Sequence, residues 1–179
     1  MAKQKKPPDL LKPIFRVIGW DPGKHNCALC LYGPDGIVDT DVIEGVGDGD
    51  INEGLGRFTE HVAQQLDWYK PDCCGVERYQ LRAGTGFVGN MERVNLMIGI
   101  LIAACRSRGI PFYLVTPSVH KVWAGKYHGA TKRKKKLCMH TCPEFKHLPT
   151  EHEADAANVA KYCGLVVFNV AQLSSPAEE

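Results

Sequence analysis

The chain of 179 residues lacks any apolar run that approaches the roughly 18 residues of a membrane-spanning helix. Its first segment, Met1 to Pro13, is rich in lysine and proline and has no apolar core of the kind found in secretion signals. The net charge is only +2, so global charge indicates no particular partner. These absences predict an intracellular protein with no membrane partner.

Nucleotide-binding fingerprints are also missing. The glycine-spaced stretch Ala83-Gly84-Thr85-Gly86 lacks the Lys-Ser/Thr pair of a P-loop and does not fit the dinucleotide-binding pattern. We interpret it as a mobile loop that shapes a neighbouring site. No nucleotide cofactor is expected.

Eight cysteines are present, but without a secretion signal they are expected to stay reduced. Cys27 and Cys30 form a CxxC pair within an apolar run, and Cys138 and Cys142 are spaced CxxxC with no matching second pair. Structural zinc is the minority interpretation, and small buried hydrophobic side chains are favoured.

The hydrophobic pattern predicts one α/β domain over 14–170, preceded by a flexible basic, proline-rich arm (1–13) and followed by a polar tail (171–179). Expected strands are 14–20, 27–32, 37–43, 72–77 and 110–115; expected helices are 51–69, 88–108, a short one ending at 125, 131–141 and 151–163. The result is a five-stranded mixed sheet, an antiparallel meander plus two parallel strands, flanked by helices. The apolar helix 88–108 fits a wide core face and a partner-subunit contact equally well.

Acidic residues follow two of these strands and open the last helix. Asp21 and Glu77 each end an apolar strand, and His152 and Asp155 lie one helical turn apart. Acids gathered at one sheet edge repel one another unless a divalent cation joins them, and Mg²⁺ or Mn²⁺ there suits phosphodiester hydrolysis. Glu153 fits a capping box with Thr150, which favours a structural role, and Glu151 with Asp155 is a rival same-face pair.

A basic run, Lys132-Arg133-Lys134-Lys135-Lys136, stands out in a nearly neutral chain. Such a run is usually a solvated helix face, and nuclear targeting is a further interpretation. Because it precedes the acid-bearing helix, contact with the phosphates of a nucleic acid is favoured.

Three motifs, in this order and at these intervals, resemble the RuvC-type Holliday junction resolvases of the RNase H-like (retroviral integrase) superfamily. They are Ile18-Gly19-Trp20-Asp21-Pro22-Gly23, Gly75-Val76-Glu77 and His152-Glu153-Ala154-Asp155-Ala156-Ala157. The similarity covers about 14–165 and implies an RNase H-like fold. It also implies four catalytic, metal-binding positions, carried here by Asp21, Glu77, His152 and Asp155.

The resemblance implies a structure-selective endodeoxyribonuclease that resolves four-way DNA junctions by paired symmetric nicks in recombination and repair. It implies a homodimer that uses Mg²⁺, with Mn²⁺ able to substitute, in the cytoplasm of a bacterial or phage-infected cell, or in the nucleus if the source is eukaryotic. Lys121 and Lys132 resemble DNA-contacting positions of the family. We extend that prediction to the neighbouring basic and aromatic residues Arg78, Tyr79, Arg133, Lys134, Lys135 and Lys136.

Some features depart from the family. Bacterial members often carry a Phe shortly after the glutamate, whereas Tyr79 lies near that place at a different offset. The basic run and the Lys/Pro arm are not expected of the bacterial enzyme, so we expect a divergent, phage or viral member. Two other functions stay open: an RNase H-like nuclease acting on RNA–DNA hybrids or on flap or branched DNA, and a catalytically silent junction-binding scaffold.

Overall fold

The computed structural model describes residues 15–23, 25–46, 49–78, 88–133 and 136–168. The predicted arm, the loop at 83–86 and the polar tail lie outside these residues, as do Tyr79, Lys134 and Lys135. No described helix is long and apolar enough to cross a membrane.

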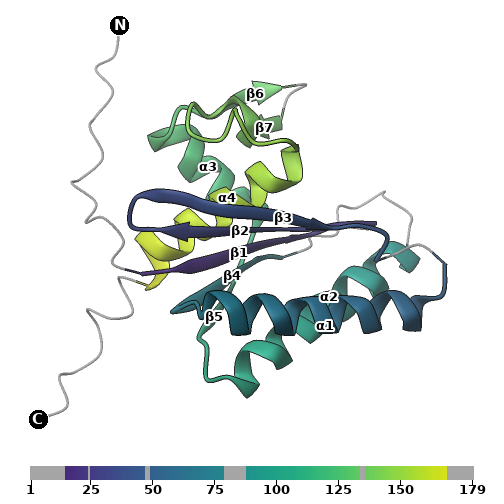
Figure 1. Cartoon of the computed structure of the whole chain (residues 1–179). Coiled ribbons are helices and arrows are strands. Elements are labelled where there is room, and N and C mark those ends of the chain that lie inside the picture. Colours follow the sequence, from purple (N-terminus) through teal and green to yellow (C-terminus); the bar gives the residue numbers. More distant parts are fainter. Residues whose placement is uncertain (1–14, 24, 47–48, 79–87, 134–135, 169–179) are drawn as a thin grey trace, which may run out of the picture.

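A five-stranded mixed sheet forms the centre of the molecule (Figure 1), with the strand order β3-β2-β1-β4-β5. The first three strands form an antiparallel meander, and β4 and β5 run parallel to β1. This arrangement confirms the predicted sheet. The strands are β1 (Val17–Pro22), β2 (Cys27–Gly33), β3 (Gly36–Ile43), β4 (Cys73–Glu77) and β5 (Phe112–Val115).

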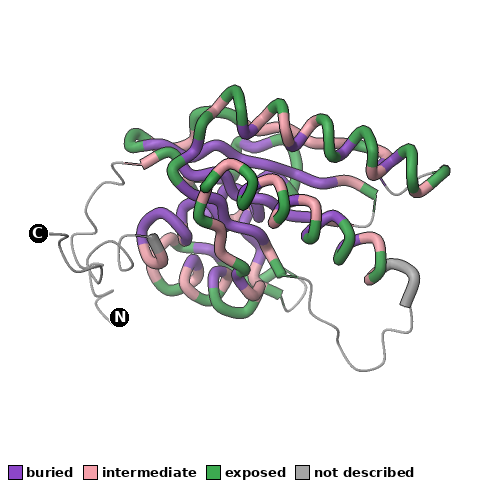
Figure 2. Tube along the Cα trace, turned by 90° about the horizontal axis from the view of Figure 1, so that it is seen from below, coloured by how far each residue is buried: buried purple, intermediate pink, exposed green. Residues whose placement is uncertain are grey.

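Helices cover both faces of this sheet, α1 and α2 on one and α3 and α4 on the other (Figure 1). The two inner layers are buried, whereas the outer faces of the helices are exposed (Figure 2). The helices are α1 (Ile51–Tyr69), α2 (Val88–Ser107), α3 (Pro117–Tyr127) and α4 (Glu151–Tyr162), and α4 continues as a π-helical segment, Cys163–Phe168. Such two-sided coverage is typical of sheets with parallel strands, here β1, β4 and β5.

Local sequence signals explain where the helices begin. The Asp50 side chain accepts a hydrogen bond from the Asn52 backbone N–H and caps α1. Thr150 and Glu153 form a reciprocal capping box at the start of α4, and Glu153 also accepts a bond from the Thr40 hydroxyl. The predicted structural role of Glu153 is therefore confirmed, and the first turn of α4 is held firmly against β3.

Helix α4 lies unusually close to the sheet because two strands carry glycine where it crosses. A Cβ atom at Gly19 would lie 2.1 Å from the carbonyl oxygen of Ala156 and 2.4 Å from the backbone nitrogen of Ala160. A Cβ at Gly75 would lie 2.4 Å from the Cys163 sulfur. Atoms cannot pack at such distances, so glycine in the strands and alanine in the helix set the approach. This close approach brings the polar residues of α4 to the ends of β1 and β4.

The predicted helix over 131–141 is wrong. Strands β6 (Thr131–Arg133) and β7 (Lys136–Cys138) pair antiparallel, and a 3-10 turn, Met139–Thr141, follows. A helix would stack like charges of the basic run three and four residues apart, which is unfavourable. In the hairpin, the Thr141 hydroxyl oxygen instead accepts from the Thr131 backbone N–H at 2.6 Å and donates to the Cys138 carbonyl at 2.7 Å.

The first strand also ends later than predicted, since β1 continues through Asp21 and Pro22. Cys27 and Cys30 are buried on opposite faces of the sheet, each within a different apolar cluster, so they share no ligand. Cys138 and Cys142 are buried thiols, and all eight cysteines are free. On α2, Val94, Met97 and Leu101 belong to the core, whereas Leu96 is 42% exposed.

Candidate active site

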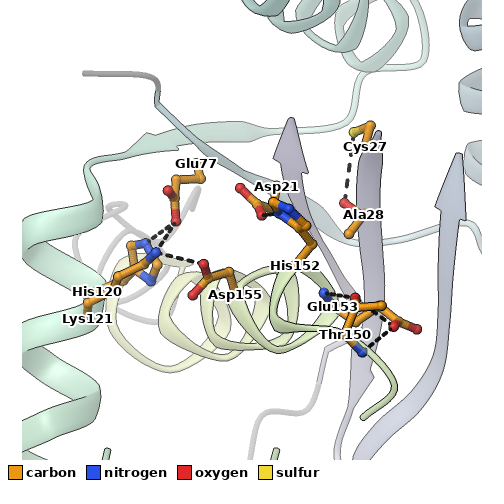
Figure 3. Close-up of polar contacts among 10 residues, drawn as sticks. All are labelled: Asp21, Cys27, Ala28, Glu77, His120, Lys121, Thr150, His152, Glu153 and Asp155. Atoms are coloured by element: carbon orange, nitrogen blue, oxygen red, sulfur yellow. Dashed lines mark hydrogen bonds and ion pairs between the residues drawn. The ribbon is translucent and has the colours of Figure 1, made fainter. Parts of the chain in front are cut away.

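Two of the predicted acids lie side by side because their strands are parallel neighbours. The last register pair of β1 and β4 is Trp20 with Val76, and Asp21 and Glu77 are the next residues on each strand. Parallel neighbours end at the same edge of a sheet. Both acids therefore stand at the carboxyl edge, where Figure 3 shows them beside the first turns of α4.

Helix α4 supplies the other two predicted residues. The Nδ1 atom of His152 lies 2.8 Å from the Asp21 carboxylate oxygen Oδ2. Asp155, one turn further along, is 8% exposed and faces the same edge (Figure 3). The rival Glu151 is exposed to solvent. All four residues predicted for catalysis thus meet at one place.

Lys121 lies among these acids. Its ammonium nitrogen is 2.7 Å from Oδ2 of Asp155 and 3.5 Å from Oε2 of Glu77 (Figure 3). The side chain is only 21% exposed. We predicted Lys121 as a DNA-contacting residue, and the structure places it inside the acidic cluster, where its charge offsets part of the repulsion between the carboxylates.

Two buried residues that the sequence pattern did not single out complete the cluster. His120 on α3 contacts Glu77 Oε2 at 2.7 Å through Nε2, and Asn158 on α4 contacts His120. One signal pointed to this place: β5 is a third parallel strand beside β4, so the helix after it had to begin near Glu77. Nothing in the sequence indicated which of its side chains would turn inward.

The electrostatics of the pair Asp21 and His152 favour a shared proton. Burial, reinforced by the charge of Glu77, raises the pKa of Asp21 even though the hydrogen bond to His152 opposes the shift. The hydrogen bond and charge of Asp21 raise the pKa of His152, against the opposing effect of burial. The imidazole is therefore a better proton acceptor than a free histidine near neutral pH.

The other two acids are shifted in opposite directions. Burial raises the pKa of Asp155 to about 7, with Lys121 opposing and Asp21 and Glu77 adding to the shift. Burial also acts on Glu77, but the His120 hydrogen bond and the Lys121 charge outweigh it and lower its pKa. The acids in turn raise the pKa of Lys121 against the effect of burial. A cluster so arranged holds fewer negative charges than its carboxylates could carry.

The donor set suits a hard divalent cation, although the side chains are not arranged around one. Among the described residues, no group of three or more His, Cys, Asp or Glu side chains has the geometry of a metal site. The ammonium of Lys121 nevertheless shows that carboxylates from two different elements face one cation. Carboxylate oxygens are the ligands that Mg²⁺ prefers, so Asp21, Glu77 and Asp155 are the residues that would hold such an ion.

Basic residues predicted to contact DNA lie beside this cluster. Arg133 and Lys136, on the β6–β7 hairpin, line an open pocket of about 480 Å³ together with Cys138 and Glu151. Glu151 is the residue before His152, so the hairpin borders the same end of α4 as the acids. Lys132 on the hairpin and Arg78 directly after β4 are both exposed.

This fold, with acids at the ends of β1 and β4 and on the helix that crosses them, is the RuvC-like fold. It superimposes on "T. thermophilus RuvC in complex with Holliday junction substrate" with a TM-score of 0.67 and 20% sequence identity, over 89% of this chain and 96% of that one. The yeast mitochondrial Holliday junction resolvase Ydc2 matches with a TM-score of 0.55 and 19% identity, over 85% of this chain and 78% of that one. At these identities the matches establish the fold.

Sequence comparison finds relatives named crossover junction endodeoxyribonuclease RuvC. The chain is 31% identical to that of Corynebacterium glutamicum in an alignment of length 133 that covers 71% of this chain and 58% of the relative. It is 29% identical to that of Corynebacterium diphtheriae in an alignment of length 130 that covers 69% of this chain and 77% of the relative. The chain thus spans little more than half of the C. glutamicum relative. No family model matches the chain.

Proposed function

We propose that the chain is a RuvC-type resolvase: a divalent-metal-dependent endodeoxyribonuclease that cuts four-way DNA junctions by paired symmetric nicks. The observation that carries this proposal is the convergence of Asp21, Glu77, His152 and Asp155 at one edge of a RuvC-like sheet. The RuvC relatives in sequence, and a RuvC of the same fold in complex with a Holliday junction substrate, support the choice of substrate.

Asp21, Glu77 and Asp155 are the residues that would hold the cation, with His152 as a further ligand or as a proton-transfer group. When bound, Mg²⁺ supplies activation of water and stabilisation of the leaving oxygen in phosphodiester hydrolysis, and Mn²⁺ is expected to substitute. The raised pKa of Asp155 makes proton release part of binding, because the carboxylate must be ionised to act as a ligand.

Lys121 has two roles in this proposal. Without a cation its ammonium offsets the charges of Glu77 and Asp155. With a cation held by these acids, the same ammonium would be available to contact a phosphate of the substrate. Lys121 thus fits the predicted DNA contact, although in the structure it lies inside the acidic cluster.

His152 is suited to moving a proton. Its Nδ1 is engaged with Asp21, which orients the ring and raises the pKa of the imidazole. The side chain is 56% exposed, so the other ring nitrogen is accessible to water or substrate. Replacing His152 is therefore expected to lower the rate of cutting more than the affinity for the junction.

Arg133 and Lys136, with Lys132 and Arg78, are proposed to bind the phosphates of the junction arms. The hairpin that carries Lys132, Arg133 and Lys136 lies next to the start of α4, so a DNA arm bound there would pass the acids.

The exposed Leu96 on α2 is a candidate contact in a homodimer whose two-fold axis would match the junction. A cytoplasmic location and a phage or viral source remain predictions of the same proposal.

The decisive experiment is cleavage of an immobile and a mobile four-way junction in Mg²⁺, mapped at nucleotide resolution, with Asp21→Asn protein alongside. Paired symmetric nicks that vanish in the variant, while junction binding persists, are expected. Hybrid, flap and duplex substrates in the same assay test the alternative nuclease functions. Binding of the junction without cutting by the unaltered protein would instead indicate a silent scaffold.

A further inference from the structure

Two buried polar residues, His120 and Asn158, lie next to Glu77 and have no part yet in the proposed chemistry. His120 on α3 and Asn158 on α4 are both 0% exposed. Polar groups in such places cost free energy unless they are hydrogen-bonded. The pair therefore calls for a physical explanation, and its contacts supply one.

The orientation of the Asn158 amide follows from the backbone. Its Nδ2 lies 3.1 Å from the carbonyl oxygen of His120, an atom that only accepts hydrogen bonds. The amide NH₂ must face it, because turning the amide round would set two oxygens against each other. The Oδ1 atom is buried with no partner among the described residues, so this orientation is kept at a cost.

The same Nδ2 lies 2.6 Å from Nδ1 of the His120 ring. Since Nδ2 is a donor, Nδ1 must accept and carries no hydrogen. The hydrogen of the ring is then on Nε2, which lies 2.7 Å from Oε2 of Glu77 (Figure 3). Asn158 thus determines which tautomer His120 adopts, and that tautomer is the one that donates to Glu77.

We propose that His120 and Asn158 are positioning residues that hold the Glu77 carboxylate in place at the acidic cluster through the Nε2–H hydrogen bond. This inference rests on the proposed function, because it treats Glu77 as a ligand of the divalent cation. Hydrogen-bond partners of metal ligands typically change metal affinity 10–100-fold when they are removed. Neither residue touches the substrate or the cation in this arrangement.

Two substitutions of His120 separate positioning from packing. In His120→Gln the longer side chain brings an amide N–H near the place of Nε2, so the donor to Glu77 is kept. In His120→Asn the shorter amide reaches only to the level of Nδ1, so the contact with Asn158 can form but Glu77 loses its donor. Both replace an imidazole by a smaller amide, so loss of core packing acts on both variants.

The first measurement is made on the unaltered, metal-free protein and does not depend on cutting. Long-range ¹H–¹⁵N correlation spectra report the tautomer of each of the seven histidines. The His120 signal, identified by its loss in His120→Gln, is expected to show hydrogen on Nε2. A hydrogen on Nδ1 would overturn the proposal. In Asn158→Ala the Nδ1–H tautomer of His120 is expected to become populated.

The second measurement is calorimetric titration of each protein with Mn²⁺ alone, without DNA. His120→Asn is expected to bind Mn²⁺ 10–100-fold more weakly than the unaltered protein, and His120→Gln within about threefold of it. Equal affinities of His120→Asn and the unaltered protein would overturn the positioning role and leave the proposed function standing. Failure of the unaltered protein to bind Mn²⁺ or to cut junctions would overturn both, even if the predicted tautomer were observed.

Discussion

Replacing Asp155 by asparagine is expected to stabilise the metal-free protein, and more so at high pH than at low pH. Burial raises the pKa of this carboxyl to about 7, against the ordinary value of 3.8. The folded protein therefore binds more protons than the unfolded chain between these values, and its stability falls as the pH rises through that window. Asparagine keeps the shape of the side chain and removes the titration.

The size of the effect follows from the two pKa values. Between pH 5 and pH 8, an acid with a pKa of about 7 when folded and 3.8 when unfolded lowers the free energy of unfolding by roughly 2–3 kcal/mol. The attraction of Lys121 is already included in that pKa. The stability advantage of Asp155→Asn over the unaltered protein should therefore be roughly 2–3 kcal/mol larger at pH 8 than at pH 5.

Urea denaturation at pH 5 and pH 8 in the presence of EDTA measures this difference directly. Asp67→Asn is the matched control: Asp67 is an exposed acid whose hydrogen bond to Arg108 lowers its pKa, so its ionisation does not change between these two pH values. The free energy of unfolding of the control should change between pH 5 and pH 8 by the same amount as that of the unaltered protein. If the free energy of unfolding of Asp155→Asn also changes between pH 5 and pH 8 by the same amount as that of the unaltered protein, burial does not raise the pKa of Asp155 as we infer.

Three further predictions concern packing, metal and DNA. Gly19→Ala should destabilise the protein by at least about 1–3 kcal/mol in urea denaturation, since α4 must move away from β1, whereas Gly99→Ala, in open space on α2, should be neutral or stabilising. Equal effects would contradict the close approach of α4. Added Mg²⁺ should raise the melting temperature of the unaltered protein and not that of Asp21→Asn, because only the former has the full set of carboxylates; a similar rise in both would remove Asp21 from the site. Replacing Lys132 and Lys136 together by Gln should reduce the salt dependence of junction binding, measured by fluorescence anisotropy, by about one unit of slope for each lost phosphate contact; an unchanged slope would place the hairpin away from DNA.

Several elements could be predicted from the sequence because local rules dominate them. Helix α1 has apolar residues at helical spacing and a capping aspartate, and the structure has the predicted bounds of Ile51–Tyr69. Glu153 matched a capping box and forms one. Asp21 and Glu77 end neighbouring parallel strands, so the rule that such strands share an edge was enough to bring them together.

Other features depended on contacts between distant segments. The basic run was predicted as a helix, but it forms a hairpin in which the Thr131 backbone N–H donates to the hydroxyl of Thr141, a residue beyond the second strand. Lys121 carries a charge typical of a solvated surface, yet it lies between two carboxylates. His120 and Asn158 had no visible role at all, because a tautomer is selected only when two helices meet.

The sequence by itself thus determined the sheet, most of its helices and the acids at its carboxyl edge, since each depends on periodicity, capping or strand direction over a short stretch. Only the tertiary structure decided how near α4 lies to β1, where the bare Gly19 allows an approach that no larger residue would permit. It also decided which charges face each other across that contact. Both are properties of atoms from remote parts of the chain, and a local pattern carries no information about the distances between them.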